Sequence, residues 1–473
     1  MRETWSTSGV DLSLELDRSG GRRIGLEKAI RSAVSNGRLA QRARLPSTRA
    51  LAAQLGLSRG TVSAAYDQLV SEGYLVARRG AGTEVADLAL LSRSTGPPPV
   101  PAPRAPYDLR PGRPDVSTFP TSSWIRATRR ALTGVSTSVF NYGEPQGRPE
   151  LRGALADYLG RTRGVQANPD QIVLTSGYVQ GLALLSGVLT RSLPAAIAME
   201  DPNLPFHREV VRRAGGNVVG VPIDDQGIRT DRLGRLGPPE VVAVVVTPAH
   251  QYPLGPTLSP GRRHELIGWA RRSGGLIIED DYDGEFRYDR QPVGAIQGMA
   301  PDCVAYLGTA SKTLGPALRL GWMVLPPNLI GAVVDAKLHA DYQGEAIGQL
   351  VLADLLTTYA YDRHVRASRL RYRRRFNLLQ TRLAGTAAAA SAGFRLVDSA
   401  AGLHALLTFP AGLGEGPAVR DRISRQGLMV GWLGEHWHEA GDHMEGIVIG
   451  FATPSEPVFP VALAALERAL FEG

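Results

Sequence analysis

The segment Gly308–Trp322 reads GTASKTLGPALRLGW and holds one lysine, Lys312, among small and apolar residues. Two short apolar runs flank it, 303–307 before and 322–325 after, and their length is typical of buried strands. A lysine in a small-residue loop between two such strands can place its amine in a cleft. We therefore expect the fold to be organised around the amine of Lys312.

Lysine is rare in this chain, because only Lys28, Lys312 and Lys337 are lysines among 53 basic residues. Arginine stays charged, whereas a desolvated lysine can lose its proton and form a Schiff base with a carbonyl compound. The alternative is that three lysines survive by chance in an arginine-rich chain. Lys312 alone does not decide between these readings, but its neighbours do.

The composition is that of a globular protein with two or three domains: 473 residues, 43% hydrophobic and 21% charged. No apolar run of about 18 residues predicts a membrane span, and the N-terminus lacks the apolar core of a signal peptide. A single cysteine, Cys303, fits a cytoplasmic protein without disulfides. The net charge is +8, and residues 1–86 hold 13 basic and 8 acidic residues. This excess indicates an anionic partner for the N-terminal part, most simply nucleic acid.

The N-terminal part predicts three helices and a hairpin. Caps and apolar spacing favour helices over residues 22–36, 49–55 and 59–72, followed by short strands at 74–76 and 83–85. The buried face of the first helix is expected to hold Ile24, Leu26, Ile30, Ala33 and Val34. Two short helices with a glycine turn and a basic hairpin describe a winged helix-turn-helix, whose second helix enters the major groove of DNA.

This part resembles the GntR family of regulators. The resemblance rests on RLPSTRALA at residues 44–52, LSRGTV at 57–62, and YDQL at 66–69 followed by EGYL at 72–75. It implies that the DNA-facing positions are Arg49, Ser58, Arg59, Gly60, Thr61 and Ser63, and that the wing includes Arg78, Arg79 and Gly82. The alternative is a merely solvated arginine face, but the fold pattern and the charge agree on DNA. The bases that are read do not follow from the sequence.

Proline dominates the end of the segment 87–106, where residues 96–106 read GPPPVPAPRAP. Proline at this density favours an extended polyproline II chain, about 3.1 Å per residue, and prevents a packed core. We expect a winged helix-turn-helix domain at residues 1–86, a linker at 87–106 and a second domain at 107–473.

The second domain alternates apolar strands with helical stretches. Strands are predicted at residues 172–177, 196–200, 241–247, 276–282 and 304–307. Near-continuous apolar strands with helical crossovers indicate an α/β fold with a mostly parallel sheet covered on both faces. Ligands of such sheets bind at the carboxyl ends of the strands.

Residues with complementary chemistry follow these strand ends. Lys312 can bond an aldehyde, Asp280 or Asp281 can pair with a protonated ring nitrogen, and Tyr282 can donate to a phenolate oxygen. The helix N-terminus after Gly177 can hold a phosphate group. The residues expected to close on the same phosphate are Thr309, Ser311 and Arg319. Each feature alone is an ordinary cap or turn, but together they are the contacts that pyridoxal phosphate needs.

Residues 107–473 resemble the fold-type I aminotransferases, including NYGEPQG at 141–147 and TPAHQYPLG at 247–255. A protein that joins a GntR-type DNA-binding domain to such a domain resembles the MocR family of transcriptional regulators. The resemblance implies Lys312 as the Schiff-base lysine, Asp280 at the ring nitrogen and Tyr282 at the ring hydroxyl. It also implies further cofactor-binding positions at Tyr178, Val179, Thr309, Ser311 and Arg319 near the phosphate, and at His250 and Tyr252 near the ring. The choice of Asp280 over Asp281 rests on the resemblance alone.

Two departures from the family pattern concern the ligand. Leu204 stands where a tyrosine is usually placed to stack on the ring, and the strand GIVIGFA at 446–452 lacks the arginine that usually binds a substrate carboxylate. Arg319 is the remaining candidate for that role unless phosphate occupies it. Both departures weaken turnover of amino acids and leave open that the cofactor itself is the signal.

We therefore expect a regulator, rather than an enzyme, that binds double-stranded promoter DNA as a homodimer. It would respond to pyridoxal 5'-phosphate or to its adduct with an amine or amino acid, and would control vitamin B6 metabolism or amino-acid and amine metabolism. One alternative is an active aminotransferase that carries a DNA-binding domain. Another is a domain that has lost the cofactor and serves only in dimerisation, which the presence of Lys312, Asp280 and Tyr282 disfavours. No metal site is expected.

Overall fold

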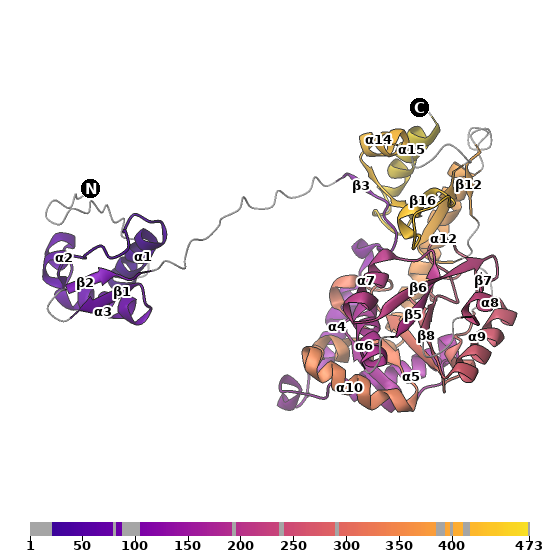
Figure 1. Ribbon diagram of the computed structural model, residues 1–473, viewed down its shortest axis with the longest axis horizontal. Coiled ribbons are helices and arrows are strands. Elements are labelled where there is room, and N and C mark those ends of the chain that lie inside the picture. The colour runs from indigo at the N-terminus through magenta and orange to yellow at the C-terminus, as the bar shows by residue number, and fades with distance from the viewer. Residues whose placement is uncertain are drawn as a thin grey trace. The chain divides into compact units, whose positions relative to one another are not determined.

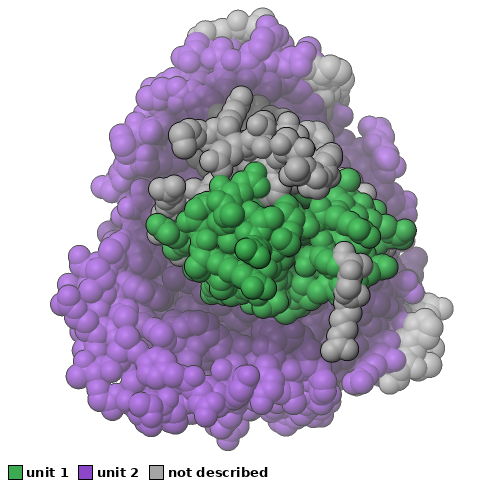
Figure 2. Space-filling view, turned by 90° about the vertical axis from the view of Figure 1, so that its left-hand side faces the viewer, with its two compact units in different colours: residues 1–103 green, residues 104–473 purple. Residues whose placement is uncertain are grey.

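The computed structural model describes residues 21–78, 82–87, 105–191, 195–235, 241–288, 293–384, 393–397, 401–409 and 417–471. The chain forms two compact units, residues 1–103 and 104–473 (Figure 2). Arg79 of the predicted wing and most of the predicted linker, residues 88–104, lie outside the described residues.

The first unit contains the three helices and the hairpin that the sequence predicts, with ends within two residues of the predicted ones. The elements are α1 (Arg22–Ser35), α2 (Thr48–Leu55), α3 (Arg59–Ser71), β1 (Leu75–Arg78) and β2 (Gly82–Val85). The two strands pair antiparallel. This order is that of a winged helix-turn-helix.

Serine caps and one apolar cluster hold the first unit together. Ser47 and Ser58 accept hydrogen bonds from the backbone N–H groups of Ala50 at 3.2 Å and Thr61 at 3.1 Å, which begins α2 and α3. Fully buried side chains from all three helices form the core, namely Leu26, Ile30, Leu51, Val62 and Leu69. The prediction for Ile24 was wrong, because its side chain is 40% exposed at the start of α1.

An eight-stranded sheet forms the centre of the second unit. Its strand order is β4-β11-β10-β9-β8-β5-β6-β7. The strands are β4 (Ile172–Thr175), β5 (Ala196–Asp201), β6 (Asn217–Asp224), β7 (Gly227–Ile228), β8 (Val241–Val246), β9 (Leu276–Asp281), β10 (Val304–Thr309) and β11 (Gly321–Val324). β10, β9, β8, β5 and β6 pair parallel, whereas β11 runs antiparallel to both of its neighbours and β7 antiparallel to β6. The prediction of a mostly parallel sheet is confirmed.

Helices cover both faces of this sheet, which explains why its strands read as continuous apolar runs. Ile277 packs in one cluster with residues of α9, whereas the next residue, Ile278, packs in another with residues of α6 and α10. Figure 1 shows α6 on one side of β5 and β8 and α9 on the other. The helices of this body are α4 (Thr121–Leu132), α5 (Pro149–Arg163), α6 (Tyr178–Thr190), α7 (Pro205–Arg213), α8 (Thr230–Leu233), α9 (Pro260–Ser273), α10 (Pro327–Asp341) and α11 (Ala346–Thr357).

The C-terminal part adds a second, smaller sheet with its own core. The sheet order is β12-β13-β16-β15, and β14 pairs parallel with the early strand β3. The strands are β3 (Tyr107–Asp108), β12 (Arg395–Leu396), β13 (His404–Thr408), β14 (Leu428–Met429), β15 (Gly431–Trp432) and β16 (Gly446–Gly450). The long helix α12 (Ala360–Leu383) and the helices α14 (Pro417–Arg425) and α15 (Phe459–Phe471) pack in this region (Figure 1).

No helix among the described residues combines the length and the apolar character that a membrane crossing requires.

Candidate functional site

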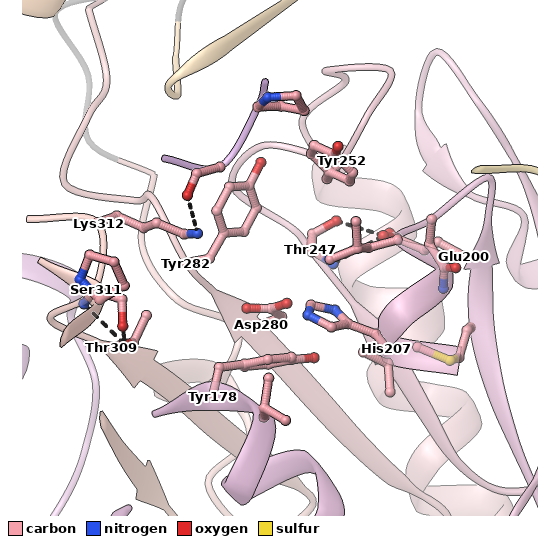
Figure 3. A pocket seen from close by; sticks show the side chains of 18 of the residues that line it. Tyr178, Glu200, His207, Thr247, Tyr252, Asp280, Tyr282, Thr309, Ser311 and Lys312 are labelled. Carbon is pink, nitrogen blue, oxygen red and sulfur yellow. Dashed lines mark hydrogen bonds between the residues drawn. The ribbon is translucent and has the colours of Figure 1, made fainter. Parts of the chain in front are cut away.

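A cavity of about 320 Å³ opens at the carboxyl ends of the central strands (Figure 3). It is lined by Pro111, Gly112, Tyr178, Val179, Met199, Glu200, Asn203, Leu204, His207, Val245, Thr247, Tyr252, Asp280, Tyr282, Thr309, Ser311, Lys312, Pro316 and Arg319. Nine of the ten residues expected at the cofactor are on this wall, and His250 is the exception. The placement agrees with the rule that parallel sheets bind ligands at their carboxyl edge.

Lys312 lies in the turn after β10, and its amine points into this cavity (Figure 3). Its Nζ atom donates a hydrogen bond to the carbonyl oxygen of Gly112 at 2.6 Å. Burial lowers the pKa of Lys312 below its ordinary value, although the nearby carboxylates of Asp280 and Asp283 oppose the shift. A lowered pKa increases the fraction of neutral amine, which is the form that attacks a carbonyl carbon.

The two adjacent aspartates at the end of β9 have opposite surroundings. Asp281 forms a buried ion pair with Arg163 at 2.6 and 2.9 Å and accepts a hydrogen bond from the hydroxyl of Tyr306 at 2.6 Å. Asp280 lines the cavity, and its buried Oδ1 atom has no hydrogen-bond partner among the described residues. Burial raises the pKa of Asp280 well above its usual range, although the nearby Tyr178 hydroxyl and Lys312 amine counteract this. Of the two carboxylates, Asp280 is therefore the one with an oxygen that can still accept a hydrogen bond from a ligand.

A histidine and an aspartate support the tyrosine that follows β9. The Tyr282 hydroxyl lines the cavity and donates to the backbone carbonyl of His250 at 3.2 Å. The His250 ring lies behind it, 2% exposed, with Nδ1 2.9 Å from Oδ2 of Asp283. From the same loop it is Tyr252 that reaches the cavity wall, where its hydroxyl lies 3.0 Å from Nε2 of His436. His250 is thus not among the residues that line the cavity, since its ring lies behind Tyr282, and its contact with the cofactor stays a prediction.

One corner of the cavity combines a helix N-terminus with a guanidinium group. Gly177 precedes α6 with φ +108, and a Cβ atom at this glycine would lie 3.4 Å from both terminal nitrogens of Arg319. The Thr309 hydroxyl donates to Ser311 Oγ at 2.8 Å and accepts from the Ser311 N–H at 3.1 Å. Arg319 forms no ion pair within the described part of the chain. Free N–H groups at a helix start, hydroxyls and an unpaired cation together suit a phosphate group.

Two titratable residues of the cavity wall were not found by sequence reasoning. Glu200, near the end of β5, accepts a hydrogen bond from the Thr247 hydroxyl at 2.6 Å, and burial raises its pKa to about 7. His207, in α7, has its ring 4.7 Å from that of Tyr178, and burial lowers its pKa to about 3, so the imidazole is neutral. The strand-ending position of Glu200 was a visible signal, whereas a lone histidine on a helix carries none.

The structure bears on both departures from the family pattern. Leu204 lines the cavity at the position in question. β16 contains no arginine, and its Val448 is fully buried against Leu406 and Leu433. Arg319 lies at the corner that suits a phosphate group, and a phosphate bound there would occupy it.

The predicted DNA-facing residues of the first unit lie at the surface. Arg49, Ser58, Arg59 and Gly60 are exposed, and Thr61 and Ser63 are half-buried. Arg49 and Arg59 form no ion pair within the described residues. In the wing, Gly82 is exposed, and Arg78 pairs with Glu84 at 2.8 Å. The surface at α2 and the start of α3 therefore presents two exposed cations without an ion pair, Arg49 and Arg59, whereas the hydroxyls of Ser58 and Thr61 are hydrogen-bonded to each other at 2.8 Å.

Two family models match the chain. "Aminotransferase class I and II" matches residues 108–415, and "Bacterial regulatory proteins, gntR family" matches residues 25–85. The HTH-type pyridoxine biosynthesis transcriptional regulator PdxR of Corynebacterium glutamicum is 35% identical, over 95% of this chain and 96% of its own length. The probable rhizopine catabolism regulatory protein MocR of Rhizobium meliloti is 32% identical, over 74% of each chain.

Solved structures show the same fold in the second unit. An archaeal alanine:glyoxylate aminotransferase matches with a TM-score of 0.70 and 23% identity, covering 77% of this chain and 91% of its own. The α-aminoadipate aminotransferase LysN of Thermus thermophilus matches with a TM-score of 0.68 and 22% identity, covering 77% and 92%.

The cavity fits pyridoxal 5'-phosphate on its own chemistry. Lys312 offers an amine with a lowered pKa, and Asp280 Oδ1 lacks the donor that a protonated ring nitrogen supplies. The corner at Arg319 offers a phosphate site. The chain belongs to the MocR family of HTH-type transcriptional regulators, in which a GntR-type DNA-binding domain precedes an aminotransferase class I and II domain, and pyridoxal 5'-phosphate is the cofactor that this family and fold indicate.

Proposed function

We propose that this protein is a cytoplasmic homodimer that binds double-stranded promoter DNA and whose DNA affinity changes when pyridoxal 5'-phosphate, or its adduct with an amine, occupies the Lys312 cavity. One observation carries the proposal: a lysine with a lowered pKa shares a cavity with an unpaired buried carboxylate oxygen, in a chain that also has a winged helix-turn-helix. The names of two relatives, one a regulator of pyridoxine biosynthesis and one of rhizopine catabolism, support control of a metabolic pathway, with vitamin B6 as one candidate.

Different residues of the cavity hold different parts of the cofactor in this proposal. When bound, pyridoxal phosphate supplies an aldehyde carbon that a neutral amine attacks and a ring that withdraws electrons from that carbon. Lys312 provides the neutral amine, and Asp280 accepts a hydrogen bond from the ring nitrogen. Tyr282 orients the ring through its hydroxyl. The phosphate is assigned to the N-terminus of α6 with Thr309, Ser311 and Arg319.

The first unit contacts DNA through the start of α3 in the proposed complex. Arg59 and Arg49 meet phosphates or base edges, and Ser58 fixes the helix start. Helix-turn-helix readers commonly act in pairs on two half-sites, which favours a homodimer. Size-exclusion chromatography with light scattering would test that state directly.

DNA binding with and without the cofactor tests the proposal. Operator fragments would be selected from a random DNA pool with the full-length protein, and their affinity measured by fluorescence anisotropy. We expect pyridoxal phosphate to change the affinity of the wild type by about fivefold or more, the usual lower range of coupling between two sites. Lys312→Ala should bind the fragments without responding to the cofactor. Equal affinities of the wild type in both conditions would contradict the proposal.

A second candidate function is an aminotransferase that carries a DNA-binding domain. Lys312 and Asp280 keep the groups that amino transfer requires, and this favours it. Steady formation of a new amino acid from a keto acid, beyond one equivalent of protein, would support the enzyme. A single equivalent or none would support the regulator.

A further inference from the structure

The cavity wall contains few positive charges. Among the described residues that line it, Lys312 and Arg319 are the basic ones, and Asp280 and Glu200 are the acidic ones. The imidazole of His207 adds no charge, because burial lowers its pKa to about 3. Arg319 is thus the permanent cation of the wall.

Arg319 lies at one end of the cavity. Its guanidinium group lies beside Gly177 at the start of α6, where a Cβ atom on this glycine would be 3.4 Å from both terminal nitrogens, and the hydroxyls of Thr309 and Ser311 are on the same wall. A phosphate group held there would use this cation together with the N–H groups of the helix. Among the described lining residues, no second permanent cation would then face the remaining part of the cavity.

The rest of the wall offers a carboxylate little compensation. The Tyr252 hydroxyl is already 3.0 Å from His436 Nε2, and behind its ring lies the apolar cluster of Leu406, Leu433 and Val448. Glu200 is 4% exposed and adds an acidic group to the same wall. Moving a carboxylate from water into such surroundings is unfavourable, because the described lining residues offer it no permanent cation besides Arg319, and neutral donors such as the Tyr178 hydroxyl replace only part of its hydration.

We propose that this site compensates one anionic group, the phosphate of pyridoxal phosphate. A primary amine without a carboxylate therefore binds beside the cofactor more tightly than an α-amino acid does. The inference rests on the proposed function, because it needs pyridoxal phosphate at the Arg319 corner. It narrows the effector class to simple amines, which lack the second anion.

A matched pair of ligands tests this preference. Isopropylamine and L-alanine differ in that a carboxylate replaces one methyl group. The full-length protein would first be loaded with pyridoxal phosphate, and loading would be followed by visible absorbance. Each ligand would then be titrated by calorimetry at pH 8. We expect alanine to bind at least about tenfold more weakly, since it must lose the hydration of its carboxylate. The preference runs against intrinsic reactivity, because the amine of alanine is less basic and more of it is neutral.

A variant that adds a cation sharpens the test. Leu204 lines the cavity and is half-buried, so Leu204→Arg can place a guanidinium group there, and Leu204→Met serves as the uncharged control. Leu204→Arg should reduce the difference in affinity between isopropylamine and alanine, and Leu204→Met should leave this difference unchanged.

Each result bears on one of the two proposals. A failure to load pyridoxal phosphate would contradict the proposed function and the inference with it. A loaded protein that binds alanine as well as isopropylamine, or that binds neither, would overturn the inference alone.

Discussion

The two candidate sites of this protein are both suited to phosphate-bearing ligands, but they are built in opposite ways. On the first unit, Arg49 and Arg59 are exposed and free of ion pairs. In the cavity of the second unit, Lys312 and Asp280 are removed from water and their pKa values shift as a result. Exposed charges act additively and are screened by salt, whereas buried groups act through individual contacts. Substitutions should therefore have graded effects on the DNA surface and steep effects in the cavity.

The largest effect is expected at the buried ion pair next to the cavity. Asp281→Asn leaves Arg163 without its buried partner and should lower the free energy of unfolding by about 3–5 kcal/mol. Asp280→Asn is the matched control, because its carboxylate has an unpaired oxygen; its stability should change by less than about 1 kcal/mol while cofactor affinity falls. Urea unfolding followed by tryptophan fluorescence reports on the second unit, where all the described tryptophans lie. Equal losses of stability in both variants would remove the distinction between the two aspartates.

A pH-dependent effect should follow from Glu200. Its pKa in the folded protein is raised from 4.5 to about 7, so between these values the folded state binds more protons than the unfolded state. Stability contributed by this group is therefore lost as pH rises through that window, by about 3 kcal/mol in total. Glu200→Gln cannot ionise, so it should gain stability relative to the wild type at pH 8 compared with pH 4.5.

Urea unfolding at the two pH values measures this difference. Asp157→Asn, a change at an exposed acidic residue of α5, is the control and should give no such gain. A Glu200→Gln variant that differs from the wild type by the same amount at both pH values would show that the carboxyl group is not held protonated.

A smaller effect is expected on the DNA surface. Arg59→Ala should weaken DNA binding about tenfold and reduce the slope of log affinity against log salt by about one, without changing cofactor uptake. Arg212→Ala removes the same charge from an exposed position of α7 and should leave DNA affinity unchanged. If both variants weaken binding equally, overall charge rather than the α3 surface holds the DNA.

The smallest effect should come from the cap of α3. Ser58→Ala removes the hydrogen bond to the Thr61 N–H and should destabilise the helix start by about 1 kcal/mol. Hydrogen exchange in the full-length protein should then be faster at the Thr61 amide, while amides of the central sheet keep their wild-type rates. Unchanged exchange at Thr61 would mean that the cap does not stabilise this helix.

Much of the fold could be predicted from patterns that are local in sequence. Serine caps and apolar spacing located α2 and α3, and apolar runs such as Val241–Val246 located the strands of the parallel sheet. Ile24 was misplaced because the spacing of apolar residues did not fix the rotation of the first turn of α1.

The site could be predicted only where a motif or a strand end marks it. Lys312 and Asp280 follow strands, so their place at the sheet edge could be expected. The roles of Glu200 and His207 depend on which side chains surround them, and the sequence does not contain that information. The same applies to His250, whose ring lies behind Tyr282 because it pairs with Asp283.

The most direct test of the account is covalent capture at Lys312. The protein would be incubated with pyridoxal 5'-phosphate, reduced with borohydride and digested, and the modified peptide identified by mass spectrometry. The account predicts a visible absorbance band before reduction and a stable phosphopyridoxyl group on Lys312 after it, both absent from Lys312→Ala. A wild-type protein that stays colourless, or that is modified equally at Lys28, Lys312 and Lys337, would contradict it.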